Sequence, residues 1–272
     1  MAFVKRTGFA REFDTTDFNS SDFSIEVSKG NIPGVTLIHK FGHNETVGTS
    51  FVPIVSGGVW NTPQVANATA FRVKAGNAGD TNGGAGAWEI EIHGILPTGA
   101  SATATLTLAG TSASAATAQT FIRILRAFVT KSGAYASQTT ASHIADIVIE
   151  NAAGGTDWAT IPTILISQGQ TQIGVYTVPL GFSAYLQGFT LAVETNKPLD
   201  VVFLKRGSIL DTAAPYQAMR VFSEVKGLEG TFTEDFKYPM KFDELTDIGA
   251  MAKVSTGSAK VSIDMELILV EN

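Results

Sequence analysis

Short segments in which apolar and polar residues alternate recur along most of the chain, and they constrain the fold more than any other feature. In the stretch from Ala87 to His93, Trp88, Ile90 and Ile92 alternate with polar residues. A period of two places these apolar side chains on one face of a β-strand. Glycine, proline, asparagine and serine separate such segments at short intervals, as turns do. The pattern predicts many short antiparallel strands.

The expected strands cover most of the chain after residue 34. The segment 120–131 is ambiguous between a helix and a long buried strand, and its Phe, Ile and Val content favours the strand. Residues 243–252 form the best candidate for a short helix or turn. The sequence therefore predicts an all-β fold with one or two antiparallel β-sandwich or jelly-roll domains. The expected strands are 35–41, 69–75, 87–93, 103–108, 120–131, 144–150, 162–167, 172–178, 183–195, 199–205, 219–225, 230–236 and 260–270.

Residues 1–34 differ from the rest of the chain and predict an extended N-terminal arm. Five phenylalanines recur every four to six positions among polar residues, which fits neither a helix stripe nor strand alternation. Each could anchor the arm in a pocket of its own domain or of a neighbouring subunit. An ordinary N-terminal strand and loop is the equally weighted alternative. The proposed anchors are Phe3, Phe9, Phe13, Phe18 and Phe23.

A change in strand regularity near residues 168–170 predicts a boundary between two β domains. The first would be a β-sandwich at 35–168 and the second a jelly-roll-like domain at 169–272. Both lengths suit the usual size of a domain. One continuous large sandwich is the alternative.

Charge and cysteine content exclude several classes of function. The chain has 19 basic and 25 acidic residues, so its net charge is -6, and a broad nucleic-acid-binding face is not expected. The absence of cysteine excludes disulfides, thiolate metal sites and cysteine nucleophiles. No apolar run approaches the roughly 20 residues that span a bilayer, so no membrane partner is expected. The first residues contain no apolar signal-peptide core, which predicts synthesis in the cytoplasm.

Candidate metal sites have simpler interpretations. His39 and His43 are four residues apart, a spacing that suits a metal on a helix, whereas this segment is predicted to be a strand. Glu91 and His93 share the expected outer face of one strand with Glu89. The run that begins at Asp80 resembles the start of a calcium loop, but alanine stands where such a loop needs glycine. We therefore predict solvated strand faces and a turn, with no metal and no cofactor.

An acidic cluster in the last third of the chain is the only candidate for catalysis. Paired carboxylates hydrolyse glycosides when they lie about 5 to 10 Å apart. Lysines are interleaved with this cluster, so a charged rim is the preferred interpretation. No phosphate-binding, zinc-helix or nucleophile-elbow motif is present. We expect no catalytic residues and no enzyme. The cluster comprises Glu234, Asp235, Asp243, Glu244 and Asp247.

Several strings in a fixed order resemble virion structural proteins of tailed bacteriophages. Residues 84–96 form a glycine- and alanine-rich turn that enters a strand, and 103–110 form the Thr/Leu strand that follows it in that family. The segments 121–128 and 175–186 are similar to the next strand and to a hairpin of phage β domains. The C-terminal 246–272 looks like their closing strands. The resemblance covers about residues 36–272 and leaves the arm outside.

This resemblance implies a component of the virion rather than an enzyme. A capsid decoration or cement protein is the leading expectation. Such a protein would assemble as a homo-oligomer, for which a trimer is one arrangement. It would contact the major capsid protein or other virion proteins. A tail- or fibre-associated module that binds host-surface glycan is the alternative, motivated by Trp60, Trp88 and Trp158. A glycan depolymerase that uses Asp243 and Asp247 is the third hypothesis.

Overall fold

The chain folds into β-strands almost throughout. The computed structural model describes residues 23–58, 68–137, 140–163, 169–194 and 196–272. Strands account for 56% and helix for 3%, and every strand pair is antiparallel. The prediction of an all-β, sandwich-like fold is confirmed.

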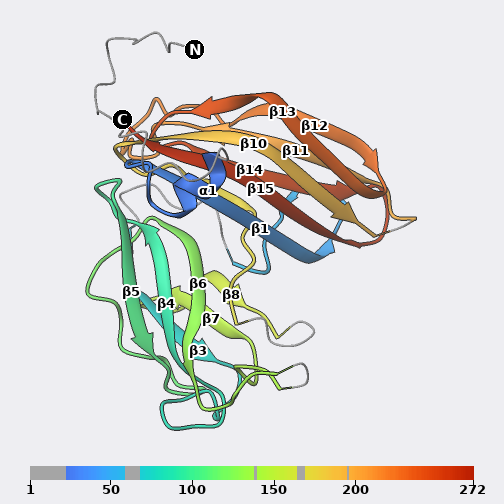
Figure 1. Cartoon of the computed structure of the whole chain (residues 1–272). Helices are drawn as coiled ribbons and strands as arrows, with labels where there is room; N and C mark the ends of the chain where they lie inside the picture. The colour runs from blue at the N-terminus through green and yellow to red at the C-terminus, as the bar shows by residue number, and fades with distance from the viewer. Residues whose placement is uncertain (1–22, 59–67, 138–139, 164–168, 195) are drawn as a thin grey trace.

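The elements follow one another in the order that Figure 1 labels. They are α1 (Phe23–Ser28), β1 (Val35–Val47), β2 (Val52–Pro53), β3 (Phe71–Ala75), β4 (Ala87–Ile95), β5 (Ser101–Thr107), β6 (Arg123–Ser132), β7 (Ile147–Asn151), β8 (Asp157–Ile161), β9 (Val175–Thr177), β10 (Phe182–Val193), β11 (Leu199–Arg206), β12 (Arg220–Leu228), β13 (Gly230–Phe242), β14 (Asp247–Val254) and β15 (Ala259–Glu271).

One body of the molecule is a sandwich of two sheets. The first sheet has the order β1-β15-β10-β13, and the second has the order β12-β11-β14-β2, with β9 also paired to β14. One face of strand β15 packs between the two sheets. Its residues Val261, Ile263, Met265 and Leu267 are buried, while the intervening residues face outward. These side chains join a large apolar cluster that both sheets share. We call this body the large sandwich.

The other body contains two three-stranded sheets, ordered β3-β7-β8 and β5-β4-β6. Ile90 and Ile92 of β4 are fully buried, as the alternation predicts, and Trp88 is half-buried. Phe71 and Phe121 stack with their ring centroids 5.0 Å apart, and Trp158 contacts Phe71 edge-on at 5.1 Å. This aromatic group belongs to a second apolar cluster. We call this body the inserted unit.

The chain enters the large sandwich, leaves it and returns. Strands β1 and β2 precede the inserted unit, yet β1 pairs with β15 and β2 pairs with β14. In Figure 1 the blue β1 accordingly lies beside the red C-terminal strands, and the green strands form a separate layer below them. The predicted domain 35–168 therefore assigns residues 35–53 to the wrong sheets. Local alternation identifies a strand but does not identify its distant partner, which explains the difference.

The predicted arm is only partly within the described residues. Phe23 begins the short helix α1 and is half exposed, whereas Glu26 and Val27 are buried. Glu26 accepts hydrogen bonds from Lys29 Nζ at 3.1 Å and Asn31 Nδ2 at 2.6 Å, which closes the C-terminal side of the helix. Residues 23–28 are thus helical rather than extended, because this local polar network stabilises a turn of helix. The anchors Phe3, Phe9, Phe13 and Phe18 lie outside the described residues.

Candidate functional site

Three members of the predicted acidic cluster have different polar partners in the structure. Asp243 forms an ion pair with Lys241 at 3.0 Å, which raises the pKa of that lysine. Glu244 accepts a hydrogen bond from the backbone nitrogen of Gly181 at 2.7 Å. Asp247 is buried on β14 and belongs to a different polar network. These three carboxylates therefore have individual structural partners. Glu234 and Asp235 lie on β13, opposite Phe189 and Gly188 of β10.

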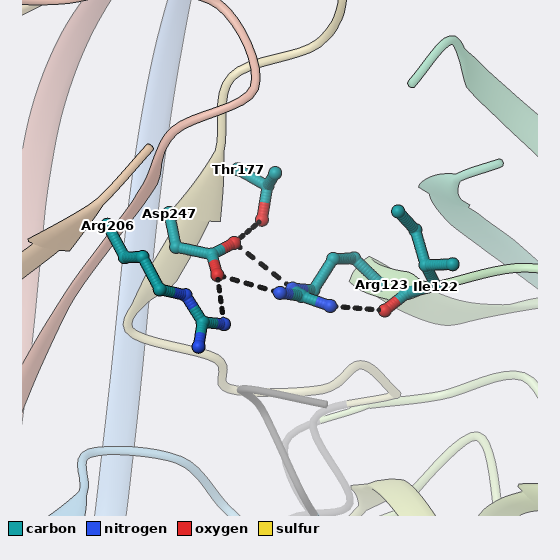
Figure 2. A network of polar contacts seen from close by, with 5 residues as sticks. All are labelled: Ile122, Arg123, Thr177, Arg206 and Asp247. Atoms are coloured by element: carbon teal, nitrogen blue, oxygen red, sulfur yellow. Dashed lines mark hydrogen bonds and ion pairs between the residues drawn. The ribbon is translucent and has the colours of Figure 1, made fainter. Parts of the chain in front are cut away.

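Asp247 is the centre of a buried network that joins the two bodies of the molecule (Figure 2). Arg123 on β6 donates from Nε to Oδ1 at 3.0 Å and from Nη2 to Oδ2 at 2.7 Å. Thr177 donates its hydroxyl to Oδ1 at 2.8 Å, and Arg206 on β11 donates to Oδ2 at 3.2 Å. The side chains of Arg123 and Asp247 are only 3% and 1% exposed. This burial distinguishes the pair from an ordinary surface salt bridge.

The geometry of the network indicates that it holds the two bodies of the molecule in a fixed relative orientation. Both oxygens of Asp247 accept two hydrogen bonds each, so the carboxylate is fully engaged with neighbouring side chains. Arg123 also donates from Nη1 to the carbonyl oxygen of Ile122 at 2.8 Å. A planar guanidinium that binds a carboxylate at two points fixes orientation as well as distance. The network thus holds β6 of the inserted unit against β9, β11 and β14 of the large sandwich.

Sequence reasoning missed Arg123 and Arg206 as partners of Asp247. One local signal was present, since Arg123 occupies an inward position in the apolar segment that includes Phe121 and Ile122. An arginine at such a position requires a buried acceptor. The identity of that acceptor depends on tertiary structure.

Lys40 is a second buried charge at the same junction. It lies on β1, and its Nζ donates a hydrogen bond to the carbonyl oxygen of Leu125 on β6. Burial, together with the positive charge of Arg126, lowers the pKa of Lys40 to about 7. The contact between the two bodies therefore contains a group whose charge changes near neutral pH.

The predicted histidine sites lie on strands. His43 contacts Glu45 at 2.8 Å and Ser262 at 2.7 Å, and His39 lies 3.6 Å from Asp264. His93 contacts Glu91 at 2.7 Å. In the ranges that the structure describes, no group of three or more histidine, aspartate or glutamate residues is arranged to hold a metal ion.

Asp80 organises a turn, as its preferred interpretation predicted. Its carboxylate is fully buried and accepts hydrogen bonds from the backbone nitrogens of Ala87 at 2.9 Å, Ile144 at 2.9 Å and Ala145 at 3.0 Å. Both oxygens of this carboxylate therefore accept hydrogen bonds from backbone amides. The loop after β3 and the segment before β7 are joined through this one side chain.

The tryptophans do not form the exposed aromatic surface that motivated the glycan-binding alternative. Trp158 is buried in the core of the inserted unit, which corrects that expectation. Trp88 is half-buried, and its Nε1 donates to the carbonyl oxygen of Gly84 at 2.6 Å. Trp60 lies outside the described residues. The described helix, α1, is too short to cross a membrane.

Comparisons with known proteins give only weak likenesses. No protein-family model matches the chain, and a search of curated proteins finds no match either. A solved structure of infectious bursal disease virus, Gx strain, is 11% identical over 87% of this chain and 71% of that chain, with a TM-score of 0.23. A mutant VP2 protein of the same virus, in derived T=1 particles, is 11% identical over 88% of this chain and 76% of that chain, with a TM-score of 0.19. These neighbours are proteins of virus particles, and such TM-scores do not establish a shared fold.

Proposed function

We propose that the chain is a structural component of a tailed-bacteriophage virion. The role that fits best is a capsid decoration or cement protein without enzymatic activity, which stabilises the particle through symmetric contacts with its own copies and with the major capsid protein. The ordered series of sequence motifs over residues 84–110, 121–128 and 175–186 supports the phage assignment. All three segments lie on or between strands of the two bodies.

The observation that carries this proposal is the pair of long edge strands in the large sandwich. Among the described strands, β12 pairs only with β11, and β13 pairs only with β10. They are consecutive in the chain and end the two sheets on the same side. An edge strand presents a row of unpaired backbone groups that another chain can bind. A closed symmetric assembly would cover such edges.

Exposed apolar side chains on these strands support the same proposal. Tyr238 on β13 is 77% exposed, and Val221 on β12 is 55% exposed. Tyrosine is enriched at protein interfaces because a large apolar ring carries a polar group at its end. The regular pairing of Gly230–Asp235 with β10 gives way to a bulge before Tyr238, so this ring projects from an irregular part of the edge.

The buried network suits a protein that reinforces a particle. Arg123 and Asp247 connect two bodies that different stretches of the chain build, and the connection reduces movement between them. A rigid subunit loses less conformational freedom when it binds, which strengthens each contact. The N-terminal phenylalanines, Phe3, Phe9, Phe13, Phe18 and Phe23, are proposed as further anchors to a neighbouring subunit.

The proposal is tested by the mass of the purified protein and by its presence in particles. Light scattering after size exclusion gives the oligomeric state of the wild type and of a Val221→Ser, Tyr238→Ser double variant. Tyr135→Ser is the matched control, because Tyr135 is 95% exposed but lies on a loop of the inserted unit. We expect the double variant to lose subunits or particle attachment, and the control to retain both.

Cryo-electron microscopy and mass spectrometry of whole particles provide the second measurement. The expected result is density for this chain on the capsid surface with contacts at β12 or β13. A strictly monomeric protein that is also missing from purified particles would contradict the proposal.

A further inference from the structure

A polar cavity of about 260 Å³ lies in the large sandwich, where β11 ends, β12 begins and β13 leads toward β14. Most of its wall consists of charged side chains and hydrogen-bonding groups. The residues that argue for a ligand are Lys205, Ser208, Gln217, Arg220 and Lys241. Its volume lies just below the range of pockets for drug-sized ligands, so a compact ligand would fill it.

Two cations face each other across the strands that form this cavity. Lys205 on β11 and Arg220 on β12 are direct cross-strand partners. Like charges at directly opposed positions destabilise a sheet. Within the described ranges neither side chain forms an ion pair. The amine of Lys205 lies over the Phe242 ring, 5.6 Å from its centroid. An unneutralised pair in a concave site is the arrangement that an anion would stabilise.

The carboxylates on the wall are engaged with other groups. Asp243 pairs with Lys241 at 3.0 Å. Glu244 points one oxygen to the backbone nitrogen of Gly181, at 2.7 Å. Asp243 offsets Lys241, but the backbone donor leaves the negative charge of Glu244 in place. Three cations (Lys205, Arg220 and Lys241) therefore face two carboxylates, and the wall carries a net charge of +1.

Hydrogen-bond donors accompany the cations. Gln217 Nε2 donates to Ser208 Oγ at 2.9 Å, so the serine hydroxyl retains its own proton for a further acceptor. Ser208 has a backbone φ of 52°, a left-handed conformation that non-glycine residues adopt infrequently. Residues in such conformations cluster at binding and active sites.

A smaller cavity of about 90 Å³ adjoins the first and shares Gly207, Ser208 and Gln217 with it. Its wall includes Arg123 and Arg206, the two guanidinium groups that bind the single carboxylate of Asp247, and also Asp211. Arg123 and Arg206 carry two positive charges, and Asp247 and Asp211 carry two negative charges, so this second wall adds no net charge to the site.

We propose that this cavity is a binding site for a small polar ligand that carries an oxyanion, either a phosphate or a carboxylate group. Arg220 supplies a planar donor that matches both groups, and Lys205 supplies a point charge. Ser208 and Gln217 supply neutral hydrogen bonds to the body of the ligand. The proposal is independent of whether the protein belongs to a virion.

Isothermal titration calorimetry on the full chain tests the site with three probes: inorganic phosphate, glucose 6-phosphate and glucuronate. Neutral glucose is the ligand control. The test variants are Lys205→Gln and Arg220→Gln. Lys226→Gln is the matched variant, because Lys226 lies on the same strand, pairs with Glu224 at 3.4 Å and does not line the cavity.

We expect saturable binding of at least one anionic probe, weakened about tenfold to hundredfold in each test variant and unchanged in Lys226→Gln. Preference for glucuronate over both phosphates identifies a carboxylate ligand, and the opposite order identifies a phosphate. Without ligand, the melting temperatures of the test variants should equal or exceed that of the wild type, because the like-charge pair is relieved. The proposal is overturned if no anion binds saturably, or if Lys226→Gln weakens binding as much as Arg220→Gln.

Discussion

Arg123 and Asp247 are 124 residues apart in the chain and meet through two hydrogen bonds, with side chains only 3% and 1% exposed. Each residue belongs to a different body of the molecule, so their contact specifies how the inserted unit sits on the large sandwich. A buried ion pair adds little stability compared with well-packed apolar residues, because both charges lose their hydration. Its directional hydrogen bonds nevertheless define one geometry. The main role of the pair is therefore to set the orientation of the inserted unit on the large sandwich.

Replacing Arg123 with methionine should lower the free energy of unfolding by about 3 kcal/mol, the lower end of the range for breaking a buried pair. Arg206 and Thr177 still contact Asp247 in this variant, which limits the loss. Urea unfolding monitored by tryptophan fluorescence measures the change.

Arg126→Met is the control, since Arg126 lies on the same strand, is exposed and donates to Gln170 Oε1 at 2.8 Å. It should change stability by less than about 1 kcal/mol. Equal effects of the two substitutions would show that the ion pair has no special role in the junction.

The sequence predicted individual strands better than it predicted their partners. Alternation located β4 and its buried Ile90 and Ile92, because a half-buried strand has one apolar face. Residues 243–252 were expected to form a helix or turn, yet Asp247–Val254 is strand β14. Only the first four residues of this central strand are buried on both faces, and two of its four inward residues after Asp247 are alanines, so its apolar alternation is weak. The pairing of β1 with β15 and the contact of Arg123 with Asp247 depend on distant residues and leave no local pattern.

Gly42 should not tolerate a side chain. A Cβ at this position would overlap the backbone nitrogen of Gly174 and the carbonyl oxygen of Ile54, two atoms that hydrogen-bond to each other at 3.0 Å. Backbone atoms cannot move aside as a flexible side chain can, so we expect Gly42→Ala to lose about 1–3 kcal/mol or more. Gly48→Ala is the control, because a Cβ there meets no atom within 4 Å. Chemical denaturation compares the two, and equal midpoints would refute the close approach of these segments.

Asp80→Asn should destabilise the inserted unit, because an amide nitrogen would replace one of the oxygens that accept from Ala87, Ile144 and Ala145. An amide group facing backbone donors leaves buried N–H groups without an acceptor, at a cost of about 1–3 kcal/mol. Hydrogen exchange should accelerate at the amides of Ile144 and Ala145. Asp157→Asn, at an exposed position on β8, should leave both exchange and stability unchanged. Unaltered exchange at Ile144 in Asp80→Asn would contradict the role assigned to this carboxylate.

The stability of the protein should depend on pH through Lys40. Burial lowers the pKa of Lys40 to about 7 in the folded state, against an ordinary value near 10.5 in the unfolded chain. Between these values the unfolded state binds one more proton than the folded state, so the free energy of unfolding rises as pH rises. The slope is at most about 1.4 kcal/mol per pH unit. Burial raises the pKa of Tyr176 above its ordinary value of 10, which favours unfolding at higher pH, so the clean window is pH 7 to 9.5.

Lys40→Met should abolish this rise, because methionine carries no proton in either state. The variant should exceed the wild type in stability most clearly at pH 7. The difference should shrink toward pH 9.5, because the folded lysine is already neutral and the proton that the unfolded wild type holds becomes less favourable as pH rises. Urea unfolding at half-unit pH steps gives both curves. Lys74→Met on β3 is the control, since Lys74 is exposed, and it should retain the slope of the wild type. A wild-type curve that is flat across this window would show that the amine of Lys40 remains charged in the folded protein and that its contact with Leu125 leaves it hydrated.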